Sequence, residues 1–332
     1  MNNELLSVED LSIIYKADGD IVKAVTGLNF TLAKGETLGL IGETGAGKTT
    51  AALGIMGLVP NPPGEIINGR VVFEGKDLLQ LSEDEMRQIR GNKISMIFQD
   101  PMTSLNPVMT VGEQIAEVIL IHDDVSREES ESKAREMLEL VGIPGERAGD
   151  YPHQFSGGMK QRVVIAIALA CSPDLLIADE PTTALDVTIQ AQVLDLMKEL
   201  KSKYNTAMLL ITHDLGVVAQ VCDKVAIMYA GEVVESGNIR DVYQNTRHPY
   251  TKGLFGSIPD LKSSADRLNP IKGLMPDPTH LPSGCKFHPR CPEAVATCAT
   301  AQPHAVITEA GHAVKCHMSQ RVTEMSMAME VQ

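Results

Sequence analysis

The fold of this chain is indicated most strongly by the stretch Gly42-Glu43-Thr44-Gly45-Ala46-Gly47-Lys48-Thr49. It fits the pattern G-x-x-x-x-G-K-[ST], follows the apolar run TLGLI and overlaps the start of the helix-forming run TTAALGIM. In a strand, loop and helix of this kind, small residues let backbone N–H groups wrap phosphates, and the helix N-terminus adds partial positive charge. We therefore predict a phosphate site from Gly42 to Thr50, in which Lys48 reaches the outer phosphates and Thr49 ligates Mg²⁺.

Outward from this stretch, the first three quarters of the chain alternate short apolar runs with helix-forming segments. The runs TLGLIG, KISMIF, LLIAD and AMLLIT are typical of a mostly parallel sheet covered by helices, so we expect an α/β fold. Residues 1–36 read instead as short strands joined by polar turns, which predicts a small antiparallel sheet beside the main one. The segment from about 100 to 155 is rich in helix formers without a convincing strand, which predicts a separate helical lobe.

An acidic pair, Asp179-Glu180, ends the apolar run LLIA and is followed by Pro181. The carboxyl ends of buried strands border the crevice in which α/β sheets bind ligands. Asp179 suits Mg²⁺, directly or through water, because a hard cation prefers carboxylate oxygen. Glu180 suits the attacking water, which a carboxylate beside the γ-phosphate can orient or deprotonate. Alone, the pair is only a strand that ends in a turn, but together with the phosphate loop it favours a catalytic interpretation.

Composition narrows the classes of function. The chain has 332 residues, 43% of them hydrophobic, which allows one large domain and a smaller extension. No apolar run approaches the roughly 20 residues of a membrane span, and the start MNNELLSVED lacks the layout of a signal peptide, so we expect a cytosolic protein. The formal net charge of -14 repels phosphate backbones at long range and disfavours broad binding to nucleic acid.

A third motif lies between the first two and reads Phe155-Ser156-Gly157-Gly158-Met159-Lys160-Gln161-Arg162. It leads into the helical run VVIAIALACS, so Ser156 lies at an N-cap and the two glycines leave the first-turn N–H groups open to an anion. With this motif in place the chain resembles the ABC ATPase family. The resemblance implies that this helix end, Ser156 to Gln161, faces the γ-phosphate held by a second cassette, so that two cassettes enclose two ATP molecules head to tail.

The resemblance covers about residues 5 to 240 and assigns further positions. Gln99, which ends the run KISMIFQ, matches the glutamine that senses Mg²⁺ and water, and His213 matches the histidine that contacts the γ-phosphate. Tyr15 matches the aromatic residue that stacks on adenine, although a tyrosine in a strand more often packs within the protein. The loop that crosses the dimer interface corresponds to Ala184-Leu185-Asp186.

Three classes of ABC protein compete at this point: a transporter subunit, a soluble protein of translation and a DNA-maintenance ATPase. Translation-type members resemble two cassettes in one chain, and only one is present here. Repair-type members insert a long coiled coil, whereas only 108 positions separate Lys48 from Ser156, with no heptad stretch between them. The absence of a membrane span disfavours a fused exporter. We therefore expect a transporter subunit.

A finer resemblance comes from residues 99–107, from His248-Pro249-Tyr250-Thr251 and from the cysteine-bearing tail. These look like the oligopeptide/dipeptide and nickel subfamily of importers. The resemblance implies a second, different ATPase subunit, two membrane permease subunits and, indirectly, a solute-binding protein, with this chain peripheral at the cytoplasmic face of the membrane. The helical lobe would dock a coupling helix of the permease. Peptides are the expected cargo, and nickel or another small solute is the alternative.

Beyond residue 240 the strand and helix rhythm fades, and we expect a cassette over 1–240 followed by an extension over 241–332. The extension holds Cys285-x5-Cys291-x6-Cys298 and then Cys316. Four thiols are enough for one [4Fe–4S] cluster, which the resemblance favours. Zn²⁺ is the rival, because His288, His312 and His317 could each replace a thiolate, and four unliganded cysteines are the third possibility. In either metal case we expect a structural role.

Overall fold

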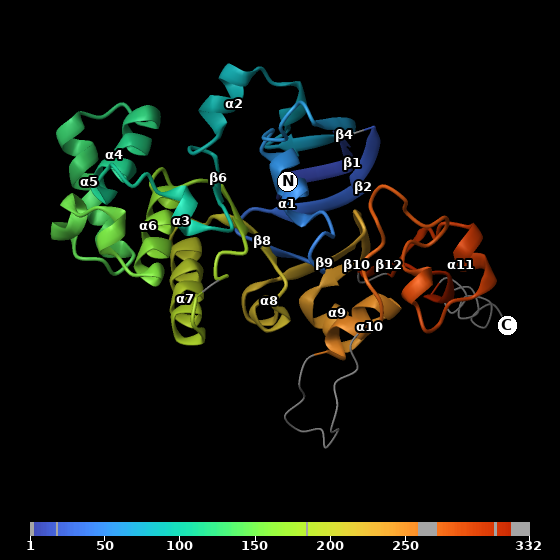
Figure 1. Ribbon diagram of the computed structural model, residues 1–332. Helices are drawn as coiled ribbons and strands as arrows, with labels where there is room; N and C mark the ends of the chain where they lie inside the picture. The colour runs from blue at the N-terminus through green and yellow to red at the C-terminus, as the bar shows by residue number, and fades with distance from the viewer. Residues whose placement is uncertain (1–2, 18, 184, 258–270, 309–310, 320–332) are drawn as a thin grey trace. The chain divides into compact units, whose positions relative to one another are not determined.

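The computed structural model describes residues 3–17, 19–183, 185–257, 271–308 and 311–319 (Figure 1). By its internal contacts the chain divides into two compact units. Unit 1 consists of Met1–Ser7, Thr31–Leu38 and Val71–Thr212. Unit 2 consists of Val8–Phe30, Gly39–Arg70 and His213–Gln332. Each unit is described by itself below.

The centre of unit 1 is a parallel sheet of three strands in the order β8-β7-β6. The strands are β6 (Ile94–Ile97), β7 (Leu175–Asp179) and β8 (Ala207–Thr212). Every residue of β7 and β8 is buried, which explains why these runs are continuously apolar rather than alternating. The predicted parallel core is confirmed here, and β7 delivers the acidic pair at its carboxyl end.

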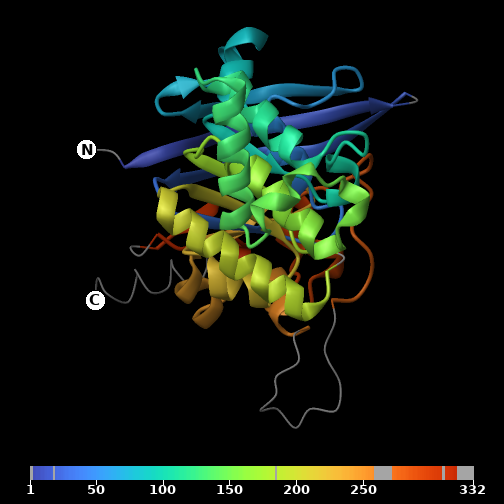
Figure 2. The same ribbon diagram turned by 90° about the vertical axis from the view of Figure 1, so that its left-hand side faces the viewer.

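Unit 1 also contains helices. They are α2 (Glu83–Ile89), α3 (Pro101–Ser104), α4 (Val111–His122), α5 (Arg127–Leu140), α6 (Gly157–Leu169) and α7 (Val187–Tyr204), with short 3-10 turns at Leu78–Gln80, Gly145–Gly149 and Pro152–Gln154. Residues 100–155 contain no strand, as predicted for the helical lobe. Helices α4 and α5 pack against each other in this lobe, which Figure 2 turns toward the viewer.

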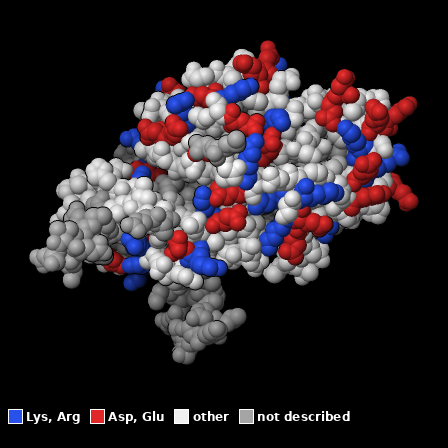
Figure 3. All heavy atoms as spheres, turned by 180° about the vertical axis from the view of Figure 1, so that it is seen from behind, with Lys and Arg blue, Asp and Glu red and all other residues white. Residues whose placement is uncertain are grey.

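The lobe helices begin where the sequence supplies capping boxes. Ser126 accepts a hydrogen bond from the Glu129 N–H at the start of α5, and the Glu129 carboxylate accepts the Ser126 N–H in return. On the outer face of α5, Arg127 pairs with Glu131 at 3.2 Å, which is the i, i+4 spacing of a solvated helix. Figure 3 shows the same interspersion of acidic and basic side chains across this side of the molecule.

Unit 2 contains an antiparallel sheet in the order β11-β12-β10-β9. Its strands are β9 (Lys224–Tyr229), β10 (Glu232–Asn238), β11 (Ala305–Ile307) and β12 (Ala313–Lys315). Its helices are α1 (Lys48–Ile55), α8 (Leu215–Val221), α9 (Ile239–Gln244), α10 (Pro249–Phe255) and α11 (Ala296–Thr300), with a 3-10 turn at His288–Arg290. Strand β12 pairs with β10 at Glu235 and Val314, so the end of the chain adds strands to this sheet.

A second sheet has the order β2-β1-β4-β5. Its strands are β1 (Glu4–Ala17), β2 (Asp20–Ala33), β4 (Gly64–Phe73) and β5 (Lys76–Asp77). Only two residues separate β1 from β2, so the two strands form a hairpin and run antiparallel, as predicted. They are much longer than expected, at 14 residues each. Strand β3 (Thr37–Ile41) follows β2 in the chain but does not belong to this sheet, and it is buried throughout and leads into the phosphate loop.

Among the described residues, the structure contains no helix that is both long enough and apolar enough to span a bilayer.

Candidate nucleotide-binding site

The loop after β3 is closed around the side chain of Lys48. Lys48 Nζ donates to the carbonyl oxygens of Gly42 at 2.8 Å and Glu43 at 3.1 Å, and the residue is only 6% exposed. A Cβ atom on Gly42 would lie 2.3 Å from the Met228 carbonyl oxygen. The loop therefore needs glycine there, and the ammonium group is held inside the curl of backbone where outer phosphates are expected.

Gly47 ends the loop and begins α1. Its φ of 100° lies in the left-handed region, and a Cβ atom there would lie 2.3 Å from the Ala24 carbonyl oxygen. The first turn of α1 carries no acidic residue, and Gly47 already accepts the N–H of Ala51. The N–H groups of Lys48, Thr49 and Thr50 precede the first intrahelical bond, so they form the anion-attracting end of the helix. The remaining loop residues lie between these points: Thr44, Gly45 and Ala46.

Two further predicted residues belong to unit 2. Tyr15 lies near the end of β1 and is half-buried, and its ring edge approaches Gly64 so closely that a Cβ atom there would be 2.9 Å away. One side of the ring therefore packs on the backbone, and part of the ring surface stays accessible. Adenine stacking by Tyr15 stays a prediction. His213 directly follows β8 and is exposed.

In unit 1, Glu180 is held by two neighbours. Its Oε2 atom accepts hydrogen bonds from Gln99 Nε2 at 3.2 Å and from Thr183 Oγ1 at 2.9 Å. The Glu180 N–H donates to the Ile211 carbonyl oxygen at 2.8 Å, and its φ of 47° lies in a region that residues other than glycine rarely adopt. Asp179, one residue earlier, is 1% exposed. The strained backbone and the two hydrogen-bond donors therefore fix the position of the Glu180 carboxylate at the carboxyl end of β7.

The third motif forms the start of α6. Ser156 is the N-cap, its hydroxyl accepts the Met159 N–H at 3.4 Å, and both Ser156 and Gly157 are exposed. Gly158 faces α7, where an added Cβ atom would lie 2.5 Å from Ile189 Cγ2. The helix end is therefore open to an anion, and the second glycine is needed for helix packing.

Two of the residues predicted to contact the second cassette have other surroundings in this chain. Gln161 is 1% exposed, so its side chain lies inside unit 1 rather than on the surface that a second cassette would meet. Asp186 is the N-cap of α7 and accepts the Ile189 N–H at 2.9 Å. Ala184, which precedes it in the predicted interface loop, lies outside the described residues.

The four tail cysteines are free thiols that line one small pocket, formed by Cys285, Cys291, Cys298, Cys316, Phe287 and their neighbours. Burial raises the pKa of Cys291 to about 11 and also raises the pKa of Cys285. No group of three or more His, Cys, Asp or Glu side chains has the arrangement of a metal site in the part of the chain that the structure describes.

The three histidines considered as substitutes for a thiolate each have another contact. His312 Nε2 lies 2.8 Å from Glu235 Oε1, and both side chains are buried. His288 Nδ1 contacts the Cys285 carbonyl oxygen and His317 Nε2 contacts the Ala301 carbonyl oxygen, each at 2.9 Å. The structure therefore gives the histidines roles in holding the tail backbone and β10.

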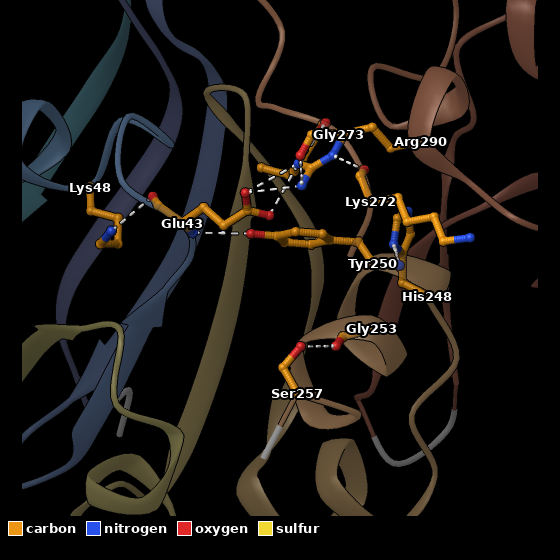
Figure 4. Close-up of polar contacts among 10 residues, drawn as sticks. Glu43, Lys48, His248, Tyr250, Gly253, Ser257, Lys272, Gly273 and Arg290 are labelled. Atoms are coloured by element: carbon orange, nitrogen blue, oxygen red, sulfur yellow. Dashed lines mark hydrogen bonds and ion pairs between the residues drawn. The ribbon is translucent and has the colours of Figure 1, made fainter. Parts of the chain in front are cut away.

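Sequence reasoning missed two residues that contact the phosphate loop. The Tyr250 hydroxyl accepts the Glu43 N–H at 3.0 Å, and Arg290 forms an ion pair with the Glu43 carboxylate at 3.1 Å (Figure 4). Tyr250 stood out only as part of the HPYT resemblance, and Arg290 gave no signal. The available clue was Glu43 itself, because an acidic residue in a loop that binds phosphates needs a counter-charge.

Comparisons with known proteins agree with this geometry. A family model described as "ABC transporter" matches residues 25–183, and one described as "Oligopeptide/dipeptide transporter, C-terminal region" matches residues 234–298. The dipeptide transport ATP-binding protein DppD of Bacillus subtilis is 51% identical over 97% of this chain and 96% of its own length. The oligopeptide transport ATP-binding protein OppD of the same organism is 56% identical over 85% of this chain and 80% of its own.

Solved structures give the same result. The dimeric ATP-binding cassette MJ0796, bound to ADP and Pi in a post-hydrolysis state, matches with a TM-score of 0.64 and 28% identity, over 71% of this chain and 99% of that one. Clostridium perfringens cbiO1, part of the ABC transporter complex cbiONQ, matches with a TM-score of 0.63 and 27% identity, over 74% and 92%. The chain belongs to the ABC transporter family, as an ATP-binding subunit of its oligopeptide/dipeptide branch.

Proposed function

We propose that this chain hydrolyses ATP to energise the import of di- and oligopeptides, with Glu180 as the residue that orients the attacking water. Membership of the family makes the chain an ATP hydrolase coupled to transport. The observation that carries the catalytic assignment is the Glu180 carboxylate, which follows buried Asp179 and accepts hydrogen bonds from Gln99 and Thr183. A carboxylate fixed by two donors keeps one geometry and can hold a water in line for attack.

The remaining roles divide among the motifs. The phosphate loop and the first turn of α1 supply N–H donors, and Lys48 supplies a positive charge for the outer phosphates. Thr49, Gln99 and Asp179 are the oxygen donors proposed for Mg²⁺, which neutralises charge on the phosphates when bound. His213 would contact the γ-phosphate and Tyr15 the adenine.

The open start of α6 supports assembly with a second ATPase subunit. Ser156 and Gly157 are exposed and no acidic residue lies in the first turn of the helix. This helix end attracts anions, and its own motif provides no phosphate for it. It therefore fits the γ-phosphate of a nucleotide that is bound to another cassette. We propose a head-to-tail pair with a different ATPase subunit, in which Asp186 and Ala184 lie at the interface. Pairing of cassettes is supported by the MJ0796 cassette, whose structure is dimeric.

A hollow on the helical lobe is the proposed docking place for a coupling helix of the two permease subunits. It is lined by Met109, Gly112, Ala116, Leu120, Ile121 and Arg135. Ile121 is 66% exposed and Leu120 is 41% exposed, an unusual apolar surface for a soluble lobe. With the lobe docked in this way, we propose that the chain lies at the cytoplasmic face of the membrane and is linked indirectly to a solute-binding protein. It also favours transport over a soluble, non-transport ABC ATPase.

Peptide cargo is supported by the names of the relatives and by the C-terminal family model. Nickel or another small solute is the alternative cargo. Uptake assays in proteoliposomes that contain the permease and the partner ATPase separate the two, because a peptide importer takes up labelled peptide and ignores ⁶³Ni²⁺.

The cassette over residues 1–240 and the extension over 241–332 remain our proposed division, with one [4Fe–4S] cluster in the extension. The support is that all four thiols line one pocket, although their side chains do not have ligand geometry in this structure. Iron, acid-labile sulfide and zinc content of protein purified without oxygen tests the proposal. About four iron and four sulfide per chain supports the cluster. Stoichiometric zinc supports the rival, and metal-free protein contradicts both.

Glu180→Gln tests the catalytic assignment. The amide keeps the shape of the side chain and loses the charge, so we expect ATP binding to persist while turnover falls by roughly 10²- to 10⁴-fold. Glu199→Gln, the same chemical change at an exposed position on α7, is the matched control and should hydrolyse ATP normally. Near wild-type turnover by the Glu180 variant, in the presence of the partner ATPase, contradicts the role of this residue.

A further inference from the structure

Glu43, the second residue of the phosphate loop, is held at every polar group by the rest of unit 2 (Figure 4). Its N–H donates to the Tyr250 hydroxyl at 3.0 Å, and its carbonyl oxygen accepts from Lys48 Nζ at 3.1 Å. Its carboxylate accepts three hydrogen bonds from Arg290: Nη1 donates to Oε1 at 3.1 Å and to Oε2 at 3.2 Å, and Nη2 donates to Oε2 at 3.2 Å. The two-pronged pair fixes the direction of the carboxylate as well as its charge.

Contacts other than the one with Glu43 also hold the Arg290 side chain in place. Its Nε donates to the Lys272 carbonyl oxygen at 3.0 Å, and Nη2 donates to that of Gly273 at 3.2 Å. Its side chain is 7% exposed. Burial alone lowers the pKa of Arg290, but hydrogen bonds to Tyr229 and Glu43 raise it above its usual value. The guanidinium group is therefore a permanent positive charge in a preset position.

The support for both contacts is a cluster of aromatic rings. Tyr229 and Tyr250 pack with centroids 4.6 Å apart, and Phe287 lies 5.1 Å from the first ring and 5.3 Å from the second. All three side chains are almost completely buried. Phe287 and Arg290 come from the cysteine-bearing segment, so this rigid cluster attaches that segment to the phosphate loop, across 247 positions of sequence from Glu43.

The charges explain why such a contact matters for nucleotide binding. A triphosphate carries several negative charges, and a carboxylate one position into its binding loop repels them unless it is neutralised. In the structure the Glu43 carboxylate pairs with Arg290, while Lys48 Nζ donates to the carbonyl oxygen of the same residue (Figure 4). The ion pair thus gives the Glu43 carboxylate a counter-charge other than Lys48, the cation proposed for the phosphates.

We propose that Arg290 is a positioning residue for ATP binding: it neutralises and orients Glu43, so the C-terminal extension sets the affinity of the phosphate loop for nucleotide. The inference rests on the proposed function of the loop. In this proposal Arg290 acts on the nucleotide through Glu43, with which it forms its ion pair. The extension is on this view part of the nucleotide site, in addition to any structural role of its cysteines.

A double-mutant cycle on the full chain tests the proposal, with ATP, ADP and adenosine affinities measured by calorimetry. We expect Arg290→Gln to weaken ATP binding about tenfold, the scale of one partly screened charge near an anion. In the Glu43→Gln background the same change should cost less than about twofold, because no carboxylate is left to repel the phosphates. Adenosine affinity should not respond, and the loss for ATP should shrink as salt concentration rises.

Four outcomes would count against the proposal or against the proposed function of the loop. Equal losses with and without Glu43 would mean that Arg290 only supports the fold, and would overturn the proposal. So would an Arg290→Gln variant that binds ATP as the wild type does while Lys48→Ala loses binding, a result that leaves the loop assignment intact. If Lys48→Ala also binds ATP normally, the proposed function of the loop itself fails. Arg290→Lys keeps the charge and should recover most of the affinity; no recovery with an unchanged thermal midpoint counts against charge neutralisation.

Discussion

Acidification should destabilise this protein through one buried histidine. His248 is 1% exposed and its Nδ1 atom accepts the Tyr250 N–H at 3.1 Å, as the N-cap of α10. Burial lowers its pKa from 6.5 to about 4, with Glu235 opposing that shift and Lys252 adding to it. A protonated ring would also lose its acceptor for the Tyr250 N–H, so the neutral form is the one that the fold uses.

The sign and size of the effect follow from this difference. Since the pKa is lower in the folded protein, the unfolded chain takes up the proton first as the pH falls. The contribution of His248 is fully present above about pH 6.5 and is lost between about pH 6.5 and pH 4. The pKa difference corresponds to roughly 3 kcal/mol of unfolding free energy in total, of which roughly 2 kcal/mol is lost between pH 7 and pH 5.

Urea unfolding followed by circular dichroism measures this loss, because the chain has no Trp to report by fluorescence. His248→Asn is the informative variant, since its Oδ1 atom can accept the Tyr250 N–H and cannot titrate. We expect the variant to lose about 2 kcal/mol less than the wild type between pH 7 and pH 5. His280→Asn removes an exposed imidazole and serves as the control. Identical pH dependence in the wild type and the His248 variant would refute the reasoning.

Three further predictions concern the loop, the third motif and the lobe. Gly47→Ala places a methyl group against the Ala24 carbonyl oxygen at a positive φ, so nucleotide binding measured by calorimetry should be lost, and normal affinity would contradict the described loop. Gly158→Ala crowds Ile189 and should lower the unfolding free energy by about 1–3 kcal/mol in thermal denaturation, whereas an unchanged midpoint would mean that α6 and α7 are not in contact. Ile121→Glu should abolish peptide uptake in proteoliposomes and retain ATP turnover in the presence of the partner ATPase; full uptake would exclude this hollow as the docking place.

Much of the nucleotide-binding region could be predicted because its signals are local. A strand, a glycine-rich loop and a helix start determine the environment of Lys48 without reference to the rest of the chain. The contact of Gln99 with Glu180 was not predicted, although both residues were singled out, and it forms because both residues follow neighbouring parallel strands, β6 and β7. The parallel sheet could also be predicted from the sequence, because strands that are buried on both faces appear as uninterrupted apolar runs.

What could not be predicted depends on distant parts of the chain or on very short elements. Arg290, the ion-pair partner of Glu43, lies 247 positions away in the sequence. No sequence pattern around Arg290 predicts this contact. Strands β11 and β12 have three residues each, too few for alternation to register. Gln161 belongs to a recognisable motif, yet the helix turns its side chain inward, and only packing determines that.

The attachment of the tail to β10 has a consequence for protein engineering. Glu235 of β10 is completely buried, and it accepts the N–H groups of Arg247 and His248 and contacts His312, all from beyond residue 240. A cassette shortened at residue 240 would keep the carboxylate, lose all three of these partners, and present β10 as an open strand edge that invites aggregation. Chimeras that exchange tails between paired ATPases should therefore take β10, the tail and Glu43 of the phosphate loop from the same parent protein.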